Sequence, residues 1–242
     1  MARQVEHEVA YYYDSHSTEK DLMGEASVHA ALVHYLVKVL RWLLREQVCA
    51  VYENLNFYQT PNPREYPLEP DIAVIKGVHF RHVRSWRVGK TGPAPQVVFE
   101  IASEETWKKD LHEKPMQYAL MGVEEYFAYD PNDPPAWRGT SQRLFGWQLE
   151  KGKRAMRAMP VDASGRLWSP CLDSLLVPEM EYLRLYDRNG LLRLSFGEAQ
   201  ERRAEAETRR AEAEARRAEV EARRAEALAE RLRSLGIDPD QV

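Results

Sequence analysis

The chain has few cysteines and no long apolar run. Its 242 residues include only two cysteines, Cys49 and Cys171, without CxxC spacing or a nearby histidine cluster. Neither a disulfide framework nor a zinc site is therefore indicated. The longest apolar run near the N-terminus, residues 30–37, is interrupted by His34 and is far too short for a membrane span. We expect no signal peptide, no transmembrane helix and a cytoplasmic location.

An excess of basic residues is also missing, because the formal net charge is −4. This balance does not favour a nucleic-acid binder, since such domains usually carry a strong basic excess. The charge is unevenly distributed, however, and residues 72–99 contain no Asp or Glu. They do contain Lys76, Arg81, Arg84, Arg87 and Lys90, interleaved with His79, Phe80, His82 and Trp86. Two interpretations stay open: a solvated hairpin, or a loop that contacts phosphate beside an active site.

The hydrophobic pattern predicts an α/β domain. Apolar residues recur at three- and four-residue steps over residues 25–46, which indicates a helix. Three runs typical of strands follow at 48–57, 71–75 and 96–102. A second helix is predicted over 106–121, ending at Gly122, and is followed by a strand at 125–129. Further β-hairpins are expected from the runs 142–149, 154–161 and 182–186. The first 23 residues show no clear period.

The C-terminal segment has a different composition, with paired arginines recurring every seven residues from Arg202-Arg203 to Arg223-Arg224. Glutamates stand four residues before several of these arginines, a spacing that supports a helix by about 0.2–0.5 kcal/mol per pair. Alanines occupy the heptad seam, but alanine buries little surface. We favour a weak or assisted coiled coil over a solitary solvated helix, and expect residues 1–196 to form one domain and 197–242 the long helix.

Two acidic residues stand out because they lie on apolar strands. Asp71 opens the run DIAVI after Pro70, and Glu100 lies within VVFEIA. A strand carboxylate costs desolvation free energy unless it has a partner or a metal, and two of them on adjacent strands suit a hard divalent cation. Lys114, on the following helix, is placed to stabilise charge on a phosphate. The alternatives are an edge or salt-bridge role for the acids and a solvated role for the lysine.

These residues belong to an ordered set of motifs that resembles the Uma-two family of endonucleases, within the PD-(D/E)XK restriction-endonuclease-like superfamily. The set comprises Gly24-Glu25 with His29, EPDIAV at 69–74, VVFEIAS at 97–103, DLHEK at 110–114 with Tyr118, GVEEY at 122–126, and Asp130-Pro131. Many members also carry a Glu/Arg/Ala tail. The resemblance covers nearly the whole chain and implies a restriction-endonuclease-like core, a mixed sheet flanked by helices.

The resemblance also implies a metal site. Asp71 and Glu100 would bind Mg²⁺, with Mn²⁺ as an alternative, and the carbonyl of Ile101 would be a further ligand. In the superfamily a lysine stands two residues after the second acid, but this position is Ala102. Lys114 is therefore the candidate lysine.

Two residues of the first helix match the family as well. Glu25 would act at the metal, although it also suits the first turn of a helix through the helix dipole. His29, one turn further on, would position Glu25 or be an ordinary interior histidine. Ser103 and Thr106 are expected to cap the second helix rather than to take part in catalysis.

Two functions of different classes remain. The first is a Mg-dependent endonuclease that hydrolyses nucleic acid; we expect DNA, although nothing in the residues distinguishes DNA from RNA. The second is a catalytically inactive nucleic-acid-binding or assembly protein on a nuclease fold, with the long helix as its functional surface. Under either hypothesis we expect a homo-oligomer that does not bind membranes.

Overall fold

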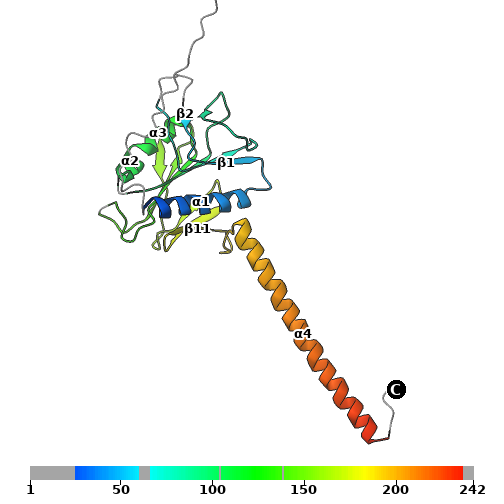
Figure 1. The fold of residues 1–242 in the computed structure, drawn as a ribbon. Coiled ribbons are helices and arrows are strands. Elements are labelled where there is room, and N and C mark those ends of the chain that lie inside the picture. Colours follow the sequence, from blue (N-terminus) through cyan, green and yellow to red (C-terminus); the bar gives the residue numbers. More distant parts are fainter. Residues whose placement is uncertain (1–24, 60–65, 104, 138, 237–242) are drawn as a thin grey trace, which may run out of the picture. The chain divides into compact units, whose positions relative to one another are not determined.

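The computed structural model of the protein describes residues 25–59, 66–103, 105–137 and 139–236, and these residues include a mixed six-stranded sheet (Figure 1). The segment 1–23 lies outside these residues. Residues 1–195 form one unit, and residues 196–242 form a second unit that holds the last helix. The two-domain organisation expected from the sequence stays a prediction.

The first unit has three helices and eleven strands in its described part. They are α1 (Glu25–Leu43), β1 (Cys49–Glu53), β2 (Phe57–Tyr58), β3 (Ile72–Lys76), β4 (Trp86–Arg87), β5 (Val97–Ile101), α2 (Trp107–His112), α3 (Lys114–Met121), β6 (Glu125–Tyr129), β7 (Leu144–Leu149), β8 (Met156–Ala158), β9 (Leu167–Ser169), β10 (Ser174–Glu179) and β11 (Tyr182–Tyr186).

The six-stranded sheet has the order β1-β3-β5-β6-β7-β8. Its central strands β5 and β6 are parallel, and every other neighbouring pair is antiparallel. Two parallel strands require a crossover connection, and α2 and α3 provide it. Strands β9, β10 and β11 form a separate antiparallel sheet, while β2 and β4 form a short parallel pair.

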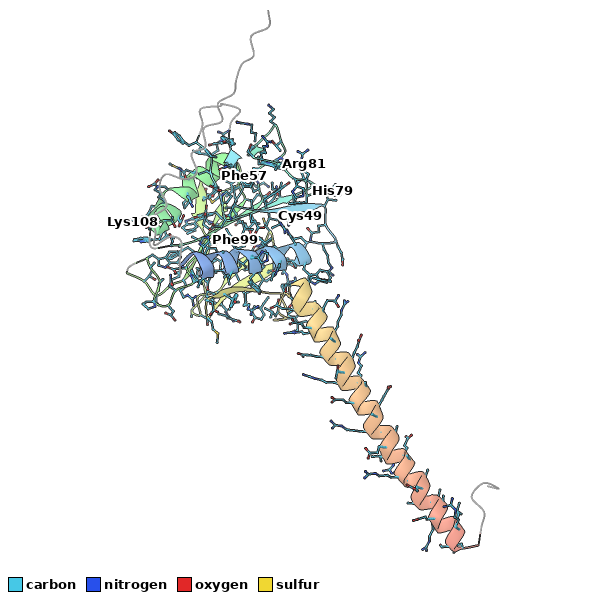
Figure 2. All side chains as sticks on the ribbon, in the orientation of Figure 1. Cys49, Phe57, His79, Arg81, Phe99 and Lys108 are labelled. Atoms are coloured by element: carbon cyan, nitrogen blue, oxygen red, sulfur yellow. The ribbon has the colours of Figure 1, made fainter. Side chains whose placement is uncertain are left out.

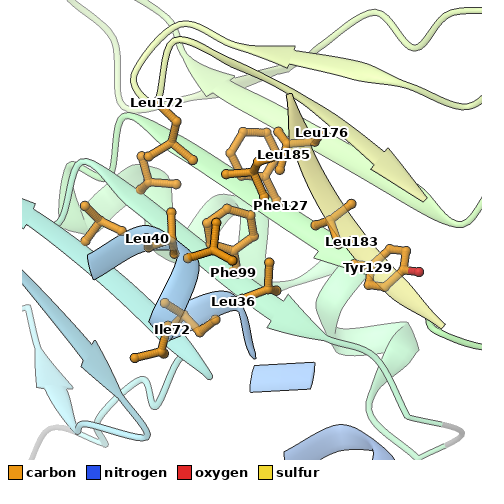
Figure 3. Packing of buried hydrophobic residues seen from close by; sticks show 14 of the residues in the cluster. Leu36, Leu40, Ile72, Phe99, Phe127, Tyr129, Leu172, Leu176, Leu183 and Leu185 are labelled. Carbon is orange, nitrogen blue, oxygen red and sulfur yellow. The ribbon is translucent and has the colours of Figure 1, made fainter. Parts of the chain in front are cut away.

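Each face of the six-stranded sheet is covered by its own apolar layer. On one face Leu36 and Leu40 of α1 pack with Ile72 and Phe99, and leucines of β10 and β11 join the same cluster (Figure 3). The opposite face packs against Tyr118 and Met121 of α3 together with the fully buried Trp86. Because side chains alternate along a strand, successive residues of β3 and β5 enter different layers.

The expected α/β class, with a mixed sheet, flanking helices, added hairpins and a long C-terminal helix, is confirmed. One predicted element is divided, because residues 106–121 form α2 and α3 with a break at Glu113. Pro115 explains the break, since it has no N–H to donate to the carbonyl of Leu111. Gly122 ends α3 in the left-handed conformation, with a φ of 90°, as the sequence predicts.

The last element is α4 (Phe196–Ser234), a helix of 39 residues with no buried side chain. Three of its predicted Glu-to-Arg pairs are formed, with N–O distances of 3.8 Å for Glu205–Arg209 and Glu212–Arg216 and 2.6 Å for Glu219–Arg223. No helix in the described part of the chain is both long and apolar enough to cross a membrane.

Candidate active site

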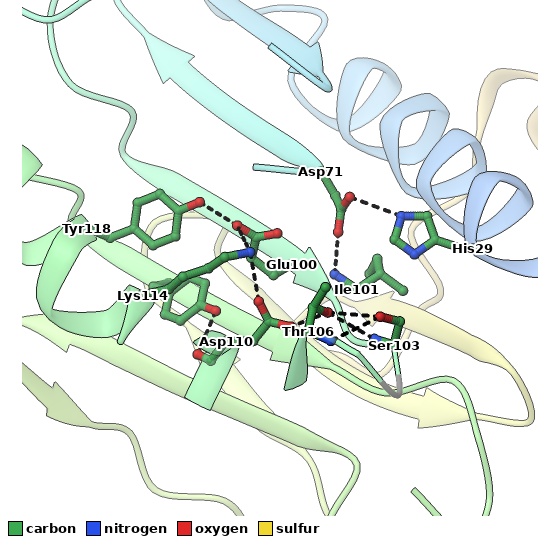
Figure 4. Close-up of polar contacts among 10 residues, drawn as sticks. His29, Asp71, Glu100, Ile101, Ser103, Thr106, Asp110, Lys114 and Tyr118 are labelled. Carbon is green, nitrogen blue, oxygen red and sulfur yellow. Dashed lines mark hydrogen bonds and ion pairs between the residues drawn. The ribbon is translucent and has the colours of Figure 1, made fainter. Parts of the chain in front are cut away.

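The register of β3 and β5 brings the two strand acids together. In this antiparallel pair Ile72 lies opposite Phe99 and Ala73 opposite Val98. Extending the register by one residue beyond Ile72 places Asp71 opposite Glu100. Opposed residues of antiparallel strands project from the same face of a sheet, so the two carboxylates lie side by side at the end of β3 (Figure 4).

Asp71 is held by two donors from different elements. Its Oδ2 accepts a hydrogen bond from the backbone N–H of Ile101 at 2.6 Å, and its Oδ1 lies 3.0 Å from Nε2 of His29 on α1. The bond to Asp71 raises the pKa of His29 above its ordinary value, against the opposing effect of burial. His29 therefore fixes the position of the Asp71 carboxylate.

Glu100 is almost fully buried, at 3% exposure. Its Oε1 lies 2.9 Å from Nζ of Lys114 and accepts a hydrogen bond of 2.5 Å from the hydroxyl of Tyr118. Figure 4 shows the carboxylate between these two groups and Asp71. Burial raises the pKa of Glu100 to about 8; the positive charge of Lys114 opposes this rise and the negative charge of Asp71 adds to it. A cation at this position would favour the ionised carboxylate.

Lys114 is the first residue of α3 and lies between two carboxylates. Its Nζ is 2.9 Å from Oε1 of Glu100 and 2.7 Å from Oδ1 of Asp110. Burial disfavours the charged ammonium group, but the negative charges of Glu100 and Asp110 prevail and raise the pKa of Lys114 to about 12. The lysine is therefore a cation fixed at the edge of the carboxylate pair.

Asp110 is a site residue to which the sequence assigned no role. It is 1% exposed, and its Oδ2 accepts a hydrogen bond of 2.8 Å from the hydroxyl of Thr106. Thr106 thus precedes α2 without capping it through its side chain, contrary to the expected role. The available signal was the four-residue spacing from Asp110 to Lys114, which places both on one helical face. Tyr118 was likewise quoted in the motif without a role.

When all three carboxyl groups are ionised, the charges of this cluster do not balance. Asp71, Glu100 and Asp110 supply three carboxylates, against the cations Lys114 and, when protonated, His29. Ionised carboxylates therefore leave at least one negative charge in a largely buried place. A divalent cation would neutralise such an excess.

The donor set fits a hard cation. In the described part of the chain, no group of three or more His, Cys, Asp or Glu side chains is arranged to hold a metal ion. The candidate ligands are therefore the carboxylates of Asp71 and Glu100, supplemented by main-chain oxygen and water. Mg²⁺ accepts such a set, since it is commonly bound through one or two carboxylates and keeps several waters.

Most of the residues expected at the site are brought together, and their roles stay predictions. Asp71, Glu100, Ile101 and Lys114 form one cluster with His29. Glu25 is the first residue of α1, but its side chain lies outside the described part of the chain. Ala102 is buried in the apolar layer beneath α3, so no lysine stands at that position.

One comparison with known proteins identifies the family of this chain. Residues 4–172 match the family model Uma2, described as "Putative restriction endonuclease", which confirms the resemblance found in the sequence. A crystal structure from Anabaena variabilis ATCC 29413, titled a "putative nuclease belonging to DUF820", is similar with a TM-score of 0.42 and 14% identity, over 60% of this chain and 73% of that chain. A search of curated proteins gives no match.

Proposed function

Because the chain belongs to the Uma2 family, described as "Putative restriction endonuclease", we propose that it is a divalent-metal-dependent endonuclease that hydrolyses phosphodiester bonds of nucleic acid. DNA is the substrate we expect over RNA. The observation that carries the proposal is the buried cluster in which Asp71 and Glu100 face each other beside the cation of Lys114.

Asp71, Glu100 and the carbonyl of Ile101 would hold Mg²⁺, or Mn²⁺ in its place. The direction of the carbonyl supports this assignment: the N–H of Ile101 donates to Asp71, and the N–H and C=O of one strand residue point to the same side of the strand. Bound there, the ion would supply Lewis-acid catalysis of hydrolysis.

The remaining residues would act on the phosphate or on the ligands. Lys114 would stabilise negative charge that develops on the phosphate, and Asp110 would hold Lys114 in place. His29 would keep the Asp71 carboxylate oriented. Glu25 is retained as a further acid at the metal, because it lies one turn before His29 on α1.

Substitution of the two acids tests the proposal. Asp71→Ala and Glu100→Ala are expected to lower cleavage of plasmid DNA in the presence of Mg²⁺ by at least about 100-fold, since changes to residues that only support metal ligands already cost about 10- to 100-fold. Glu113→Gln is the matched control, because Glu113 is an exposed acid adjacent to Lys114. Cleavage that survives both alanine substitutions would remove these acids from the mechanism.

The second candidate function is an inactive nucleic-acid-binding or assembly protein on a nuclease fold. The net charge of −4 and the repetitive α4 favour it. Deleting residues 198–242 separates the two. Loss of self-association with intact hydrolysis supports an enzyme with an assembly helix, while nucleic-acid binding without hydrolysis under any divalent metal supports the alternative.

Self-association through α4, the partner expected from the sequence, is also proposed. The alanine seam is flanked on one side by Glu205, Glu212, Glu219 and Glu226 and on the other by Glu207, Glu214 and Glu221, and the paired arginines define the arginine face. The seam itself consists of Ala204, Thr208, Ala211, Ala215, Ala218, Ala222, Ala225 and Ala229. Two seams packed together would place Glu against Glu in a parallel or an antiparallel pair, which is destabilising. We therefore place the seam of one copy against the arginine face of another.

A further inference from the structure

A second surface of the first unit carries several exposed basic residues. We define the basic loop as residues 77–92, which follow β3 and include β4. Apart from two glycines, its exposed residues are His79, Phe80, Arg81, His82, Arg84 and Lys90. No Asp or Glu occurs over residues 72–99. Within the described residues, Arg81, Arg84 and Lys90 form no ion pair with a carboxylate, in contrast to Lys114 at the candidate active site.

The loop is held in one conformation by a buried anchor. Trp86 is fully buried, and its indole Nε1 donates to the carbonyl of Pro93 at 2.9 Å. Gly92 closes against the ring so tightly that a Cβ there would lie 2.3 Å from Trp86. Arg81 donates from Nη2 to the carbonyl of Thr91 at 2.7 Å. A surface fixed in this way loses little conformational entropy when it binds a ligand.

The basic loop packs on the sheet face that carries Glu100. Val78, Val83 and Val88 of the loop contact the apolar layer that includes Val98 and Ala102. Side chains alternate along a strand, so Glu100 projects from the same face as these two residues of its strand. The loop and the carboxylate pair thus belong to one side of the molecule.

A hydrogen bond connects the basic loop to β1, the strand that pairs with β3 near Asp71. The hydroxyl of Tyr52 donates to the carbonyl of Arg81 at 2.9 Å, and Tyr52 lies opposite Ala73 on β3. Ala73 is two residues from Asp71, a separation of about 7 Å along a strand. Phosphates bound by the loop would therefore be a few nucleotides from the candidate metal site.

An exposed aromatic ring accompanies the charges. Phe80 is 48% exposed, with its ring 5.2 Å from that of Tyr52 and 5.5 Å from the guanidinium of Arg41. A hollow of about 360 Å³ beside it is lined by Phe80, Arg41, Arg45 and Gln47, among others. A partly exposed aromatic ring within a basic surface is the usual arrangement for binding unpaired bases. A duplex offers no such base, because its bases are stacked on each other.

We propose that the basic loop binds a single strand of nucleic acid beside the active site, with Arg81, Arg84 and Lys90 on its phosphates and one unpaired base stacked on Phe80. Figure 2 shows His79 and Arg81 on the same part of the molecule. The inference rests on the proposed function for the class of substrate and adds how that substrate is bound.

The test measures binding of a fluorescent 20-nucleotide single strand to the full chain in EDTA, over a range of salt concentrations. The triple variant R81A/R84A/K90A is expected to bind at least about tenfold more weakly. The slope of the logarithm of the binding constant against the logarithm of the salt concentration should decrease in magnitude by about 2. Each phosphate of a single strand that is neutralised by a protein cation contributes about 0.7 to this slope. The variant R81K/R84K should keep the wild-type slope.

The control is K151A/R154A/R157A, which removes the same charge from exposed positions around β8. It should leave the slope unchanged. An equally weakened affinity in both triple variants, or no binding by the wild type at low salt, would overturn the proposal. Thermal unfolding of each variant separates a loss of binding from a loss of folding.

Phe80 tests the single-strand part of the proposal. Phe80→Ala should weaken binding to the single strand about tenfold, while Phe80→Trp should retain it, because stacking on an aromatic ring contributes to binding of every unpaired base. The wild type should also prefer the single strand to the matching duplex. Equal binding of both, unaffected by Phe80→Ala, would contradict the assignment.

A small phosphodiester substrate separates failure of strand binding by the basic loop from failure of the proposed hydrolysis. Hydrolysis of bis(p-nitrophenyl) phosphate needs no strand binding, so it should be abolished in Asp71→Ala and kept in R81A/R84A/K90A. Strand binding by the loop without any hydrolysis would leave the inference standing and remove the endonuclease. If R81A/R84A/K90A cleaves nucleic acid as fast as the wild type, the endonuclease proposal stands and binding of the substrate by the basic loop is excluded.

Discussion

Lys114 shows how single residues set the chemistry of the candidate site. A lysine that is largely buried tends to lose its charge, but this one lies within 3 Å of two carboxylates, at 2.9 Å from Glu100 and 2.7 Å from Asp110. Only one of these, Glu100, is a proposed metal ligand. Asp110 would therefore keep Lys114 charged and oriented when a metal ion competes for Glu100.

Asp110→Asn tests this positioning role. The negative charge of Asp110 raises the pKa of Lys114, so its removal should lower that pKa and move the alkaline limit of cleavage to lower pH. We expect a loss of about 10- to 100-fold in rate at neutral pH, with metal affinity kept. The measurement is kcat as a function of pH, with Glu113→Gln as the control. A uniform loss of rate without a shift of the alkaline limit would indicate a structural role alone.

Among single residues, the strand acids Asp71 and Glu100 could be predicted from the sequence, but the contacts that their side chains make could not. Asp71 and Glu100 are visible because charged residues interrupt apolar strands, and their ordered motifs match a family. Asp110 is an ordinary-looking acid on an amphipathic helix, and only the fold of the crossover shows that it is buried against Lys114. His29 was identified as a candidate, but its contact with Asp71 depends on how α1 crosses the end of β3.

Among the elements, β7 depends on close packing at one residue. Gly146 lies opposite Phe127 of β6, and a Cβ at Gly146 would come within 2.5 Å of Cδ1 of Leu167 and 3.0 Å of the Phe127 ring. A larger residue fits only if the Leu167 side chain or the Phe127 ring moves. Strand β9 therefore packs directly on the six-stranded sheet at this point.

Gly146→Ala is expected to destabilise the first unit by about 1–3 kcal/mol, the usual cost of adding a methyl group to a full core. The matched change Gly197→Ala should not, because nothing lies within 4 Å of its added Cβ and alanine is favoured in a helix. The free energy of unfolding, from denaturant titration of both variants, checks the prediction. Equal stabilities would show that the contact with Leu167 relaxes freely.

The helix α4 gives a second prediction at this scale. If the seam of one copy packs on the arginine face of another, E207Q/E214Q/E221Q should weaken self-association, since it removes charge complementarity. Packing of seam against seam predicts the opposite, because the same change relieves repulsion. Sedimentation velocity of the full chain distinguishes the two, and a wild type that stays monomeric at every concentration would exclude self-association.

Elements with strong periodicity were predictable from the sequence, and short ones were not. The helix predicted over 25–46 follows from the spacing of its apolar residues, and α4 follows from its seven-residue repeat. The end of α3 follows from the glycine at position 122. The division of residues 106–121 depends on Pro115, which the apolar spacing alone does not reveal. Strands β9 and β10 escaped prediction because they are short or have weak alternation, and their pairing with β11 specifies them.

For the first unit as a whole, Glu125 links the two larger sheets. Glu125 is fully buried on β6, and its carboxylate accepts hydrogen bonds from the hydroxyl of Ser169 at 2.5 Å and from the N–H of Cys171 at 3.1 Å. Lys76 of β3 also donates to the carbonyl of Cys171. The turn between β9 and β10 is thus fastened to the edge of the central strands.

Burial raises the pKa of Glu125, although the bonds from Ser169 and Cys171 oppose the rise. The folded protein therefore binds more protons at this carboxyl than the unfolded chain, and stability falls as the pH rises from the ordinary carboxyl pKa through the raised one. Each pKa unit by which the folded state exceeds the unfolded state corresponds to about 1.4 kcal/mol in the free energy of unfolding. Glu125→Gln should remove this fall, as measured by denaturant unfolding between acidic and neutral pH. Parallel curves for the two proteins would contradict it.

We propose above all that Asp71 and Glu100 hold a divalent metal ion. The most direct measurement is the anomalous density of Mn²⁺ in crystals of the wild type and of the Asp71→Ala variant soaked under the same conditions. We expect an ion within coordination distance of both carboxylates in the wild type and none at that position in the variant. A wild-type site that stays empty at saturating Mn²⁺, with Lys114 still between Glu100 and Asp110, would contradict it.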